Sequence, residues 1–182
     1  MPFPKFVAVA VAGLALVAPA QAGPRPTFAA YIVDPSGKAL GTATFVGVDT
    51  GGVQVRVDVT GLTPGLHGMH VHENGSCNAL VDTTGKSTPF GAAGGHYDPK
   101  AAGHHLGPNA LGHAGDLPNL DVDDAGHART TFYDDRFSVT GPDSIVGRSI
   151  VVHANEDNYT DTPPNGGSGA RVACGEIGAL RS

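Results

Sequence analysis

The sequence predicts an all-β domain in which short antiparallel strands form a closed barrel or a sandwich. Runs of alternating or β-branched residues recur along the chain, and such runs place every second side chain on one face of a sheet. The 27 glycines and 14 prolines divide the chain into short segments, which suits tight turns better than helices. No stretch has the residue spacing of a long amphipathic helix.

Residues 1–22 are expected to be a secretory signal peptide, and residues 23–182 are expected to form the mature domain. Lys5 is followed by an apolar run at 6–17 and by the small-residue cleavage pattern Ala20-Gln21-Ala22. The apolar run is too short for a transmembrane anchor, and no cysteine lies near the cut for a lipid anchor. We therefore expect a protein with no membrane anchor that is secreted across the inner membrane to the periplasm or the extracellular space.

The mature chain is acidic. The whole chain carries a formal net charge of −6, and Lys5 is the only charge in residues 1–22, so the mature chain carries −7. Because no basic cluster is present to neutralise phosphates, we expect no nucleic-acid partner. The 160 remaining residues are enough for one domain with a hydrophobic core.

Strands are expected in the first part of the mature domain at residues 27–33, 42–48, 53–59 and 68–72. Turns at 35–37 and 50–52 separate the first three strands, which is typical of antiparallel neighbours. From residue 73 to about 117 the strand pattern disappears. A loop of this length in a compact domain is either functional or disordered, and its histidines and its cysteine favour function.

Strand patterns return at 120–122, 127–133 and 149–153, with turns at 123–126 and 140–143. A second irregular segment, 154–169, precedes a last strand at 170–177. The chain is thus expected to contain about eight short strands and two long loops, with no linker or internal repeat that would mark a second domain.

The two cysteines, Cys77 and Cys174, lie in a chain that is expected to be exported, and disulfides persist outside the cytoplasm. A bond between them would close a loop of about 97 residues, for which the chain-entropy model gives an upper figure of about 4.7 kcal/mol of stabilisation, since strain in the bond reduces it. Two free thiols or a thiolate metal site are the alternatives. Export and the wide separation favour the disulfide.

His70 and His72 lie one residue apart in an expected strand, so both imidazoles project from one face and can share a metal ion. Further donors follow in the chain at His96, His105, His113, Asp116 and His153. Neutral imidazole suits copper and zinc, and three imidazoles with one carboxylate suit a closed tetrahedral zinc site. His105, His113 and Asp116 come from one loop, which can act as a metal clip.

These donors stand in a series of motifs that covers almost the whole mature chain: GLHGMHVHE at 65–73, GHYDP at 95–99, HLGP at 105–108, GHAGDL at 112–117, VVH at 151–153 and GARVACG at 169–175. With these motifs in this order, the chain resembles a copper,zinc superoxide dismutase. The resemblance implies an eight-stranded antiparallel Greek-key β-barrel with two long functional loops. It also implies superoxide as the substrate and Cu and Zn as the cofactors.

The resemblance assigns a role to each of the donors. The implied copper ligands are His70, His72, His96 and His153. The implied zinc ligands are His96, His105, His113 and Asp116. His96 would bridge the metals and pass a proton to the forming peroxide, and Asp157 would accept hydrogen bonds from a histidine on each metal. Arg171 would attract the anionic substrate to the copper opening, against the overall negative charge.

Other residues are given lesser roles. The HLGP motif places the zinc ligand at His105 rather than at its neighbour His104. His67 matches a family histidine that braces loops through hydrogen bonds, and His127 is expected on the surface. Lys86 and Lys100 are candidates either for further steering of the substrate or for solubility alone.

Segment 154–169 is similar to the bacterial branch of the family and lacks the animal-type steering charges, so both monomer and homodimer stay open. Two rival functions are a non-catalytic copper-binding or copper-delivery protein on the same fold and a structural, zinc-stabilised β domain. Non-catalytic relatives typically lose a copper histidine or the arginine, and a zinc-stabilised domain would not need four copper histidines. This chain keeps the full set: His70, His72, His96, His153 and Arg171.

Overall fold

The computed structural model describes Met1 and residues 25–180, so the expected signal peptide lies, Met1 aside, outside the described residues. The described elements are β1 (Thr27–Val33), β2 (Ala39–Gly47), β3 (Val53–Thr60), β4 (Gly65–His67), β5 (Met69–His72), β6 (Leu80–Val81), β7 (Ser87–Thr88), the 3₁₀ helix η1 (Gly91–Ala93), β8 (Leu120–Val122), β9 (His127–Asp134), β10 (Ser149–His153), the 3₁₀ helix η2 (Pro164–Gly167) and β11 (Arg171–Ala179). In this part of the chain, no helix is long and apolar enough to cross a membrane.

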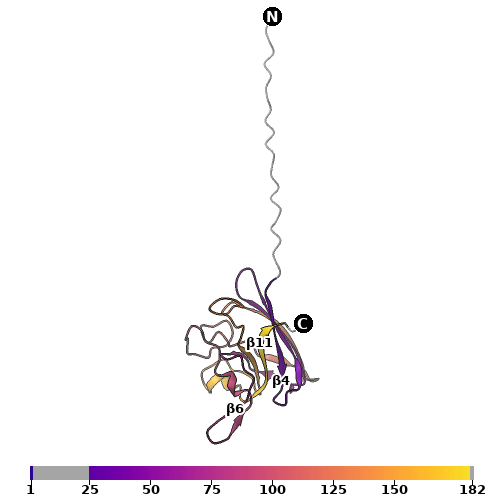
Figure 1. Cartoon of the computed structure of the whole chain (residues 1–182), viewed down its shortest axis with the longest axis vertical. Coiled ribbons are helices and arrows are strands. Elements are labelled where there is room, and N and C mark those ends of the chain that lie inside the picture. The colour runs from indigo at the N-terminus through magenta and orange to yellow at the C-terminus, as the bar shows by residue number, and fades with distance from the viewer. Residues whose placement is uncertain (2–24, 181–182) are drawn as a thin grey trace.

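Seven strands form one antiparallel sheet in the order β5-β10-β11-β1-β2-β3-β9. The strands curl around one another as a barrel does (Figure 1). β4 pairs with β8, and β8 lies beside β9. Because β4 and β5 are one strand interrupted at Gly68, these strands close the gap between the two edges of the large sheet. If the small β6–β7 hairpin is set aside, the described residues contain eight strands, as predicted for the Greek-key barrel.

The observed strands agree with the expected ones except at their ends, in one hairpin and in β4, which precedes the strand expected at 68–72. The strands at 27–33, 120–122 and 149–153 have the expected bounds. The β6–β7 hairpin was not expected, since its two-residue strands are too short to show an alternating pattern. Its turn is held by Asp82, whose Oδ1 accepts hydrogen bonds from the backbone N–H groups of Thr84 and Lys86.

The core lies inside the barrel, and the alternation along each strand decides which side chains enter it. In β3 the four valines are buried and the side chains between them point outward. In β5, Met69 and Val71 join the core, while His70 and His72 project from the opposite face. Both histidines are nevertheless fully buried, because the two long loops cover that face.

The predicted disulfide between Cys77 and Cys174 is confirmed. It lies in a small second core formed with Phe90, Ala93 and Val151. The bond joins the first long loop to β11, three residues from Arg171. The loop segment that contains Phe90 is therefore held against the strand that carries the arginine.

Candidate metal centre

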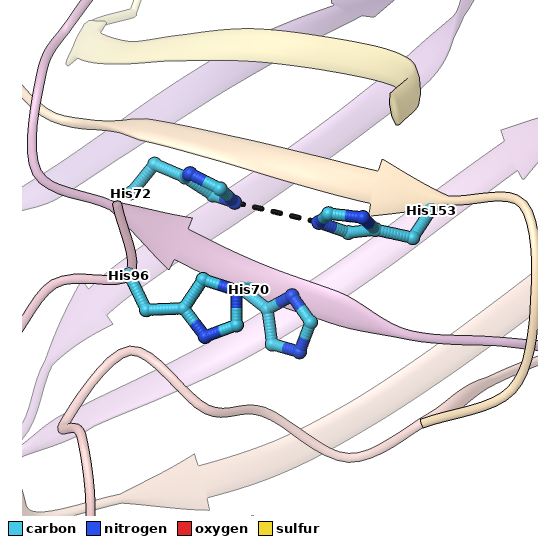
Figure 2. A group of neighbouring side chains, drawn as sticks. All are labelled: His70, His72, His96 and His153. Carbon is cyan, nitrogen blue, oxygen red and sulfur yellow. Dashed lines mark hydrogen bonds between the residues drawn. The ribbon is translucent and has the colours of Figure 1, made fainter. Parts of the chain in front are cut away.

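The residues assigned to copper come together on the outer face of the barrel. His70 and His72 lie on β5, which pairs with β10, and His153 ends β10. His96 comes from the first long loop and meets His72 through an isolated β-bridge. Figure 2 shows the rings of His72 and His153 turned toward each other and His96 beside His70. One nitrogen from each of the four rings lies within 4.8 Å of the others.

Hydrogen bonds to pure acceptors select the tautomers of these imidazoles. His72 donates from Nδ1 to the carbonyl of Gly94 at 3.0 Å, and His153 donates from Nδ1 to the carbonyl of Gly169 at 3.1 Å. The lone pairs of both rings are thus left on Nε2, and these two atoms lie 3.4 Å apart. His70 donates from Nε2 to Asp157 at 2.7 Å, which leaves its lone pair on Nδ1. A metal ligand needs such a free lone pair.

The residues assigned to zinc converge on the carboxylate of Asp116. Its Oδ1 lies 2.8 Å from Nδ1 of His96, 3.0 Å from Nδ1 of His105 and 3.4 Å from Nδ1 of His113. The group of donors around Asp116 whose ligand atoms all lie within 4.8 Å of one another contains His70, His96 and His105 but not His113. The His70 ring stacks on His96 with centroids 3.9 Å apart. His113 lies at the rim, with 17% of its side chain exposed.

Asp157 joins the two halves. Its carboxylate accepts hydrogen bonds from Nε2 of His70 at 2.7 Å and from Nε2 of His105 at 2.8 Å. Asn119 in turn holds Asp157, donating to its carbonyl at 2.9 Å and accepting from its N–H at 3.0 Å. The sequence did not point to Asn119, because it is 38 residues away from Asp157 and belongs to no metal-ligand motif.

Burial lowers the pKa values of the histidines and nearby carboxylates raise them, and a different one of these effects is larger at the copper-side histidines than at His105. Burial lowers the pKa of His70 to about 3 and that of His153 to about 4, and it lowers the pKa of His72 and His96 as well. At His105 burial also acts to lower the pKa, but the contacts of the ring with the carboxylates of Asp116 and Asp157 outweigh it and raise the pKa to about 9.

The same contacts lower the pKa values of the two carboxyl groups, Asp116 and Asp157. Burial acts to raise the pKa of Asp116, but His105 and His96 outweigh it and hold the pKa well below its usual range. Asp157 is held low in the same way by His105 and His70. Both groups are therefore carboxylates over the physiological pH range, as a ligand and an acceptor of imidazole N–H groups need to be.

Buried polar atoms without a hydrogen-bond partner test whether these residues fit a metal pair. Among the described residues, six buried side-chain N or O atoms lack such a partner, and one of them is the hydroxyl of Tyr97. The other five all belong to the assigned ligands: His70 Nδ1, His96 Nε2, His105 Nδ1, His113 Nδ1 and Asp116 Oδ2. Each such atom costs about 1–3 kcal/mol unless something satisfies it, and metal ions bound by these rings would satisfy the four nitrogens. The donors fit copper on four imidazoles and zinc on three imidazoles with one carboxylate.

Arg171 lies at the edge of the copper-side residues. Its guanidinium donates to the carbonyls of Phe90 at 2.6 Å and Gly94 at 2.5 Å, and the Gly94 carbonyl also accepts from His72. Within residues 25–180 no carboxylate forms an ion pair with this side chain. Its positive charge is therefore available to an anion that approaches the site.

The remaining predicted residues lie outside the metal centre or brace it. His104 is exposed and pairs with Asp161 at 3.0 Å, whereas its neighbour His105 is buried in the centre. His67 lies 2.6 Å from the His153 carbonyl and 2.8 Å from the Thr63 carbonyl, which agrees with a bracing role.

The three surface candidates are exposed. His127 has no contact with the centre, and Lys86 lies on the projecting β6–β7 hairpin. Lys100 is paired with Asp143 at 2.8 Å, so much of its charge is neutralised locally.

Comparisons with known proteins agree with this geometry. Residues 39–177 match the family model described as copper/zinc superoxide dismutase. The chain is 46% identical over 171 residues to the superoxide dismutase [Cu-Zn] of Deinococcus radiodurans, with 92% of each chain covered.

Two solved structures are also similar. The Cu/Zn superoxide dismutase from Brucella abortus is 42% identical, with a TM-score of 0.75, 84% of this chain covered and 99% of that one. A double mutant of a SOD-like protein from Bacillus subtilis is 32% identical, with a TM-score of 0.70, 83% of this chain covered and 97% of that one. The barrel, the two histidine groups and these matches show that the chain belongs to the copper/zinc superoxide dismutase family.

Proposed function

We propose that this chain dismutes superoxide at a copper–zinc pair. The proposed copper ligands are His70, His72, His96 and His153. The proposed zinc ligands are His96, His105, His113 and Asp116. The observation that carries the proposal is the position of His96, whose Nδ1 faces the zinc-side carboxylate while its buried Nε2 faces the copper-side histidines without a hydrogen-bond partner.

When bound, copper supplies one-electron redox chemistry, by which one superoxide is oxidised to dioxygen and a second, with one electron and two protons, is reduced to hydrogen peroxide. The protein keeps the copper-side imidazoles neutral through burial, which lowers their pKa values. Carbonyl and carboxylate acceptors behind the rings fix their tautomers and orientations.

His96 is the residue that moves a proton. The contact between Nδ1 and Asp116 sets the direction of the ring, so that Nε2 points toward the copper-side histidines. With Nδ1 and Asp116 both held by zinc, Nε2 would be the atom that takes up a proton and gives it to the departing peroxide, so that His96 would act as a general acid.

Arg171 attracts and positions the substrate. Two backbone carbonyls hold its guanidinium in place, so little side-chain entropy is lost when an anion binds. Because the chain is acidic overall, this local positive charge provides the favourable path for superoxide.

The enzyme is proposed to act outside the cytoplasm, as residues 23–182, after removal of residues 1–22. The leader-like pattern at 1–22 and the disulfide between Cys77 and Cys174 both support export to the periplasm or the extracellular space. Mass determination of the purified protein tests this step. A mature chain that begins at Gly23 is expected, and a full-length cytoplasmic chain would contradict it.

Superoxide dismutation by the copper- and zinc-loaded protein tests the function. The wild type is expected to be active, and His153→Ala and Arg171→Ala are expected to lose most of the activity. If the loaded wild type were no more active than buffer, the non-catalytic copper-binding alternative would replace the enzyme. For the zinc ligand, His105→Ala should lose zinc while His104→Ala retains it.

A further inference from the structure

Arg136 follows β9 and lies beneath the loop that carries the proposed zinc ligands. Only 15% of its side chain and 2% of the Asp134 side chain are exposed. Asp134 accepts two parallel hydrogen bonds, from Nε at 3.0 Å and from Nη2 at 2.6 Å. This two-point geometry orients the guanidinium plane as a single charge contact would not.

The rest of the guanidinium contacts the loop backbone. Nη1 donates to the carbonyls of Gly107 at 3.0 Å and His113 at 3.2 Å, and Nη2 donates to the carbonyl of Asp116 at 2.5 Å. With the two bonds to Asp134, all five N–H donors of the side chain are used. One planar group thus connects three points of the loop to the end of a barrel strand.

These three points bear directly on the zinc-side residues. His113 and Asp116 are themselves proposed ligands, and Gly107 is two residues after His105. Backbone hydrogen bonds hold the loop to β5 at Gly115 and Leu117. The guanidinium fixes the loop on its other side, where His113 is the most exposed of the proposed ligands.

We propose that Arg136 is a positioning residue for zinc, whose five hydrogen bonds preset His113 and Asp116 in the geometry that the metal needs. This inference rests on the zinc assignment made above and deepens it. Without the guanidinium, the loop has to become ordered when zinc binds. The free-energy cost of this ordering makes zinc binding weaker. Outer partners of metal ligands typically change metal affinity about 10–100-fold.

Arg136→Lys is the first test. Lysine keeps the positive charge but has three donors on one nitrogen and no planar fork, so it cannot connect Asp134 with three carbonyls. Arg129→Lys is the matched control, because Arg129 forms an exposed ion pair with Asp58 at 2.6 Å, away from the loop. Zinc affinity is measured by competition with a chelator on the metal-depleted full mature chain. The zinc site is also filled with Co²⁺ to record its visible absorption.

We expect Arg136→Lys to bind zinc about 10–100-fold more weakly and to change the Co²⁺ spectrum, with copper affinity within about two-fold of wild type. Arg129→Lys should match wild type in all three measurements. If zinc affinity and the Co²⁺ spectrum of Arg136→Lys stayed at the wild-type values, the residue would be merely structural, even if the unfolding temperature fell. Equal losses of copper and zinc affinity would also overturn the proposal.

Asp134→Asn carries the test if Arg136→Lys does not fold. The amide keeps the size of the side chain but presents one acceptor oxygen instead of a charged pair, so the guanidinium loses its anchor. Zinc should dissociate faster from this variant by about 10-fold or more, and a wild-type rate would overturn the proposal. A wild type that binds no zinc would instead refute the zinc assignment, which separates the two failures.

Discussion

The two halves of the metal centre differ in how the protein holds them. Three of the four proposed copper ligands lie on β5 and β10, which pair along four residues and contribute their inner faces to the core. On the zinc side, His105, His113 and Asp116 all come from one loop. The barrel therefore sets the copper geometry directly, whereas side-chain tethers from Asp157 and Arg136 have to set the zinc geometry.

The protonation states of the histidines also differ between the two halves. Burial makes the copper-side histidines neutral, with pKa values of about 3 for His70 and about 4 for His153. His105 lies between two carboxylates and has its pKa raised to about 9. Desolvation keeps the strand histidines neutral, whereas the two carboxylates keep His105 protonated until a metal ion replaces the proton.

The largest effect is expected from His70→Ala, compared with His113→Ala. Removing His70 takes a fully buried donor from a rigid strand, so dismutation should fall by more than the roughly 100-fold that changes in outer partners cause. Removing His113, at the rim of the loop, should release zinc with a smaller loss of dismutation. Metal content and activity of both variants measure this, and a larger activity loss in His113→Ala would contradict the distinction between the halves.

Gly166→Ala should weaken both halves together. Gly166 has φ +64°, and an added Cβ would lie 1.7 Å from Oδ1 of Asp157 and 2.8 Å from Nε2 of His105. Asp157 has to move, so copper and zinc affinity should each fall about 10–100-fold. Gly167→Ala is the control, since φ is +70° there but the Cβ would meet the Pro163 ring instead. If the control lost as much affinity as Gly166→Ala, backbone strain rather than Asp157 would be the cause.

Proton release on metal binding should differ between the halves. At pH 7 His105, with a pKa of about 9, is protonated in the metal-free protein and must lose a proton to bind zinc. His70 and His153, with pKa values near 3 and 4, are already neutral and lose none. Calorimetry of metal-depleted protein given one metal alone, in buffers of different ionisation enthalpy, should show about one proton released per zinc and about none per copper. Filling the second site should release one further proton, from His96, because a ring that binds both metals keeps no N–H. Zinc affinity should therefore rise with pH up to about 9, and equal release for both metals would contradict this difference.

The smallest effect is expected from the surface lysines. Lys100 is exposed and paired with Asp143, and exposed pairs contribute about 0–1 kcal/mol. Lys100→Ala and Lys86→Ala should each change dismutation less than about two-fold at physiological salt, where distant charges are screened. Arg171→Ala is the reference for a real steering charge. A lysine variant that matched it would place the main steering charge in the loop.

Part of the site can be predicted from the alternation of side chains along single strands. The alternation in Met69–His72 is enough to predict that two histidines share one face, because successive side chains of a strand point to opposite faces. The same rule predicted most strands to within a few residues. The β6–β7 hairpin and β4 escaped it, since strands of two or three residues have no measurable period.

The family motifs added the long-range partners that no period reveals. They pointed to Asp157 as the shared acceptor and to His105 over His104, and the contacts of both residues agree. The full ligand assignment stays a prediction until metal binding is measured.

The donor types, the strand alternation, the two cysteines and the acidic charge can be read from the chain alone, because they depend on residue identity and on spacings of a few residues. The five hydrogen bonds of Arg136 beneath the zinc-side loop, and those of Asn119 to Asp157 across 38 residues, become visible in the folded molecule. Such bonds depend on where packed loops cross the barrel. Their partners are adjacent in space and unrelated in sequence spacing.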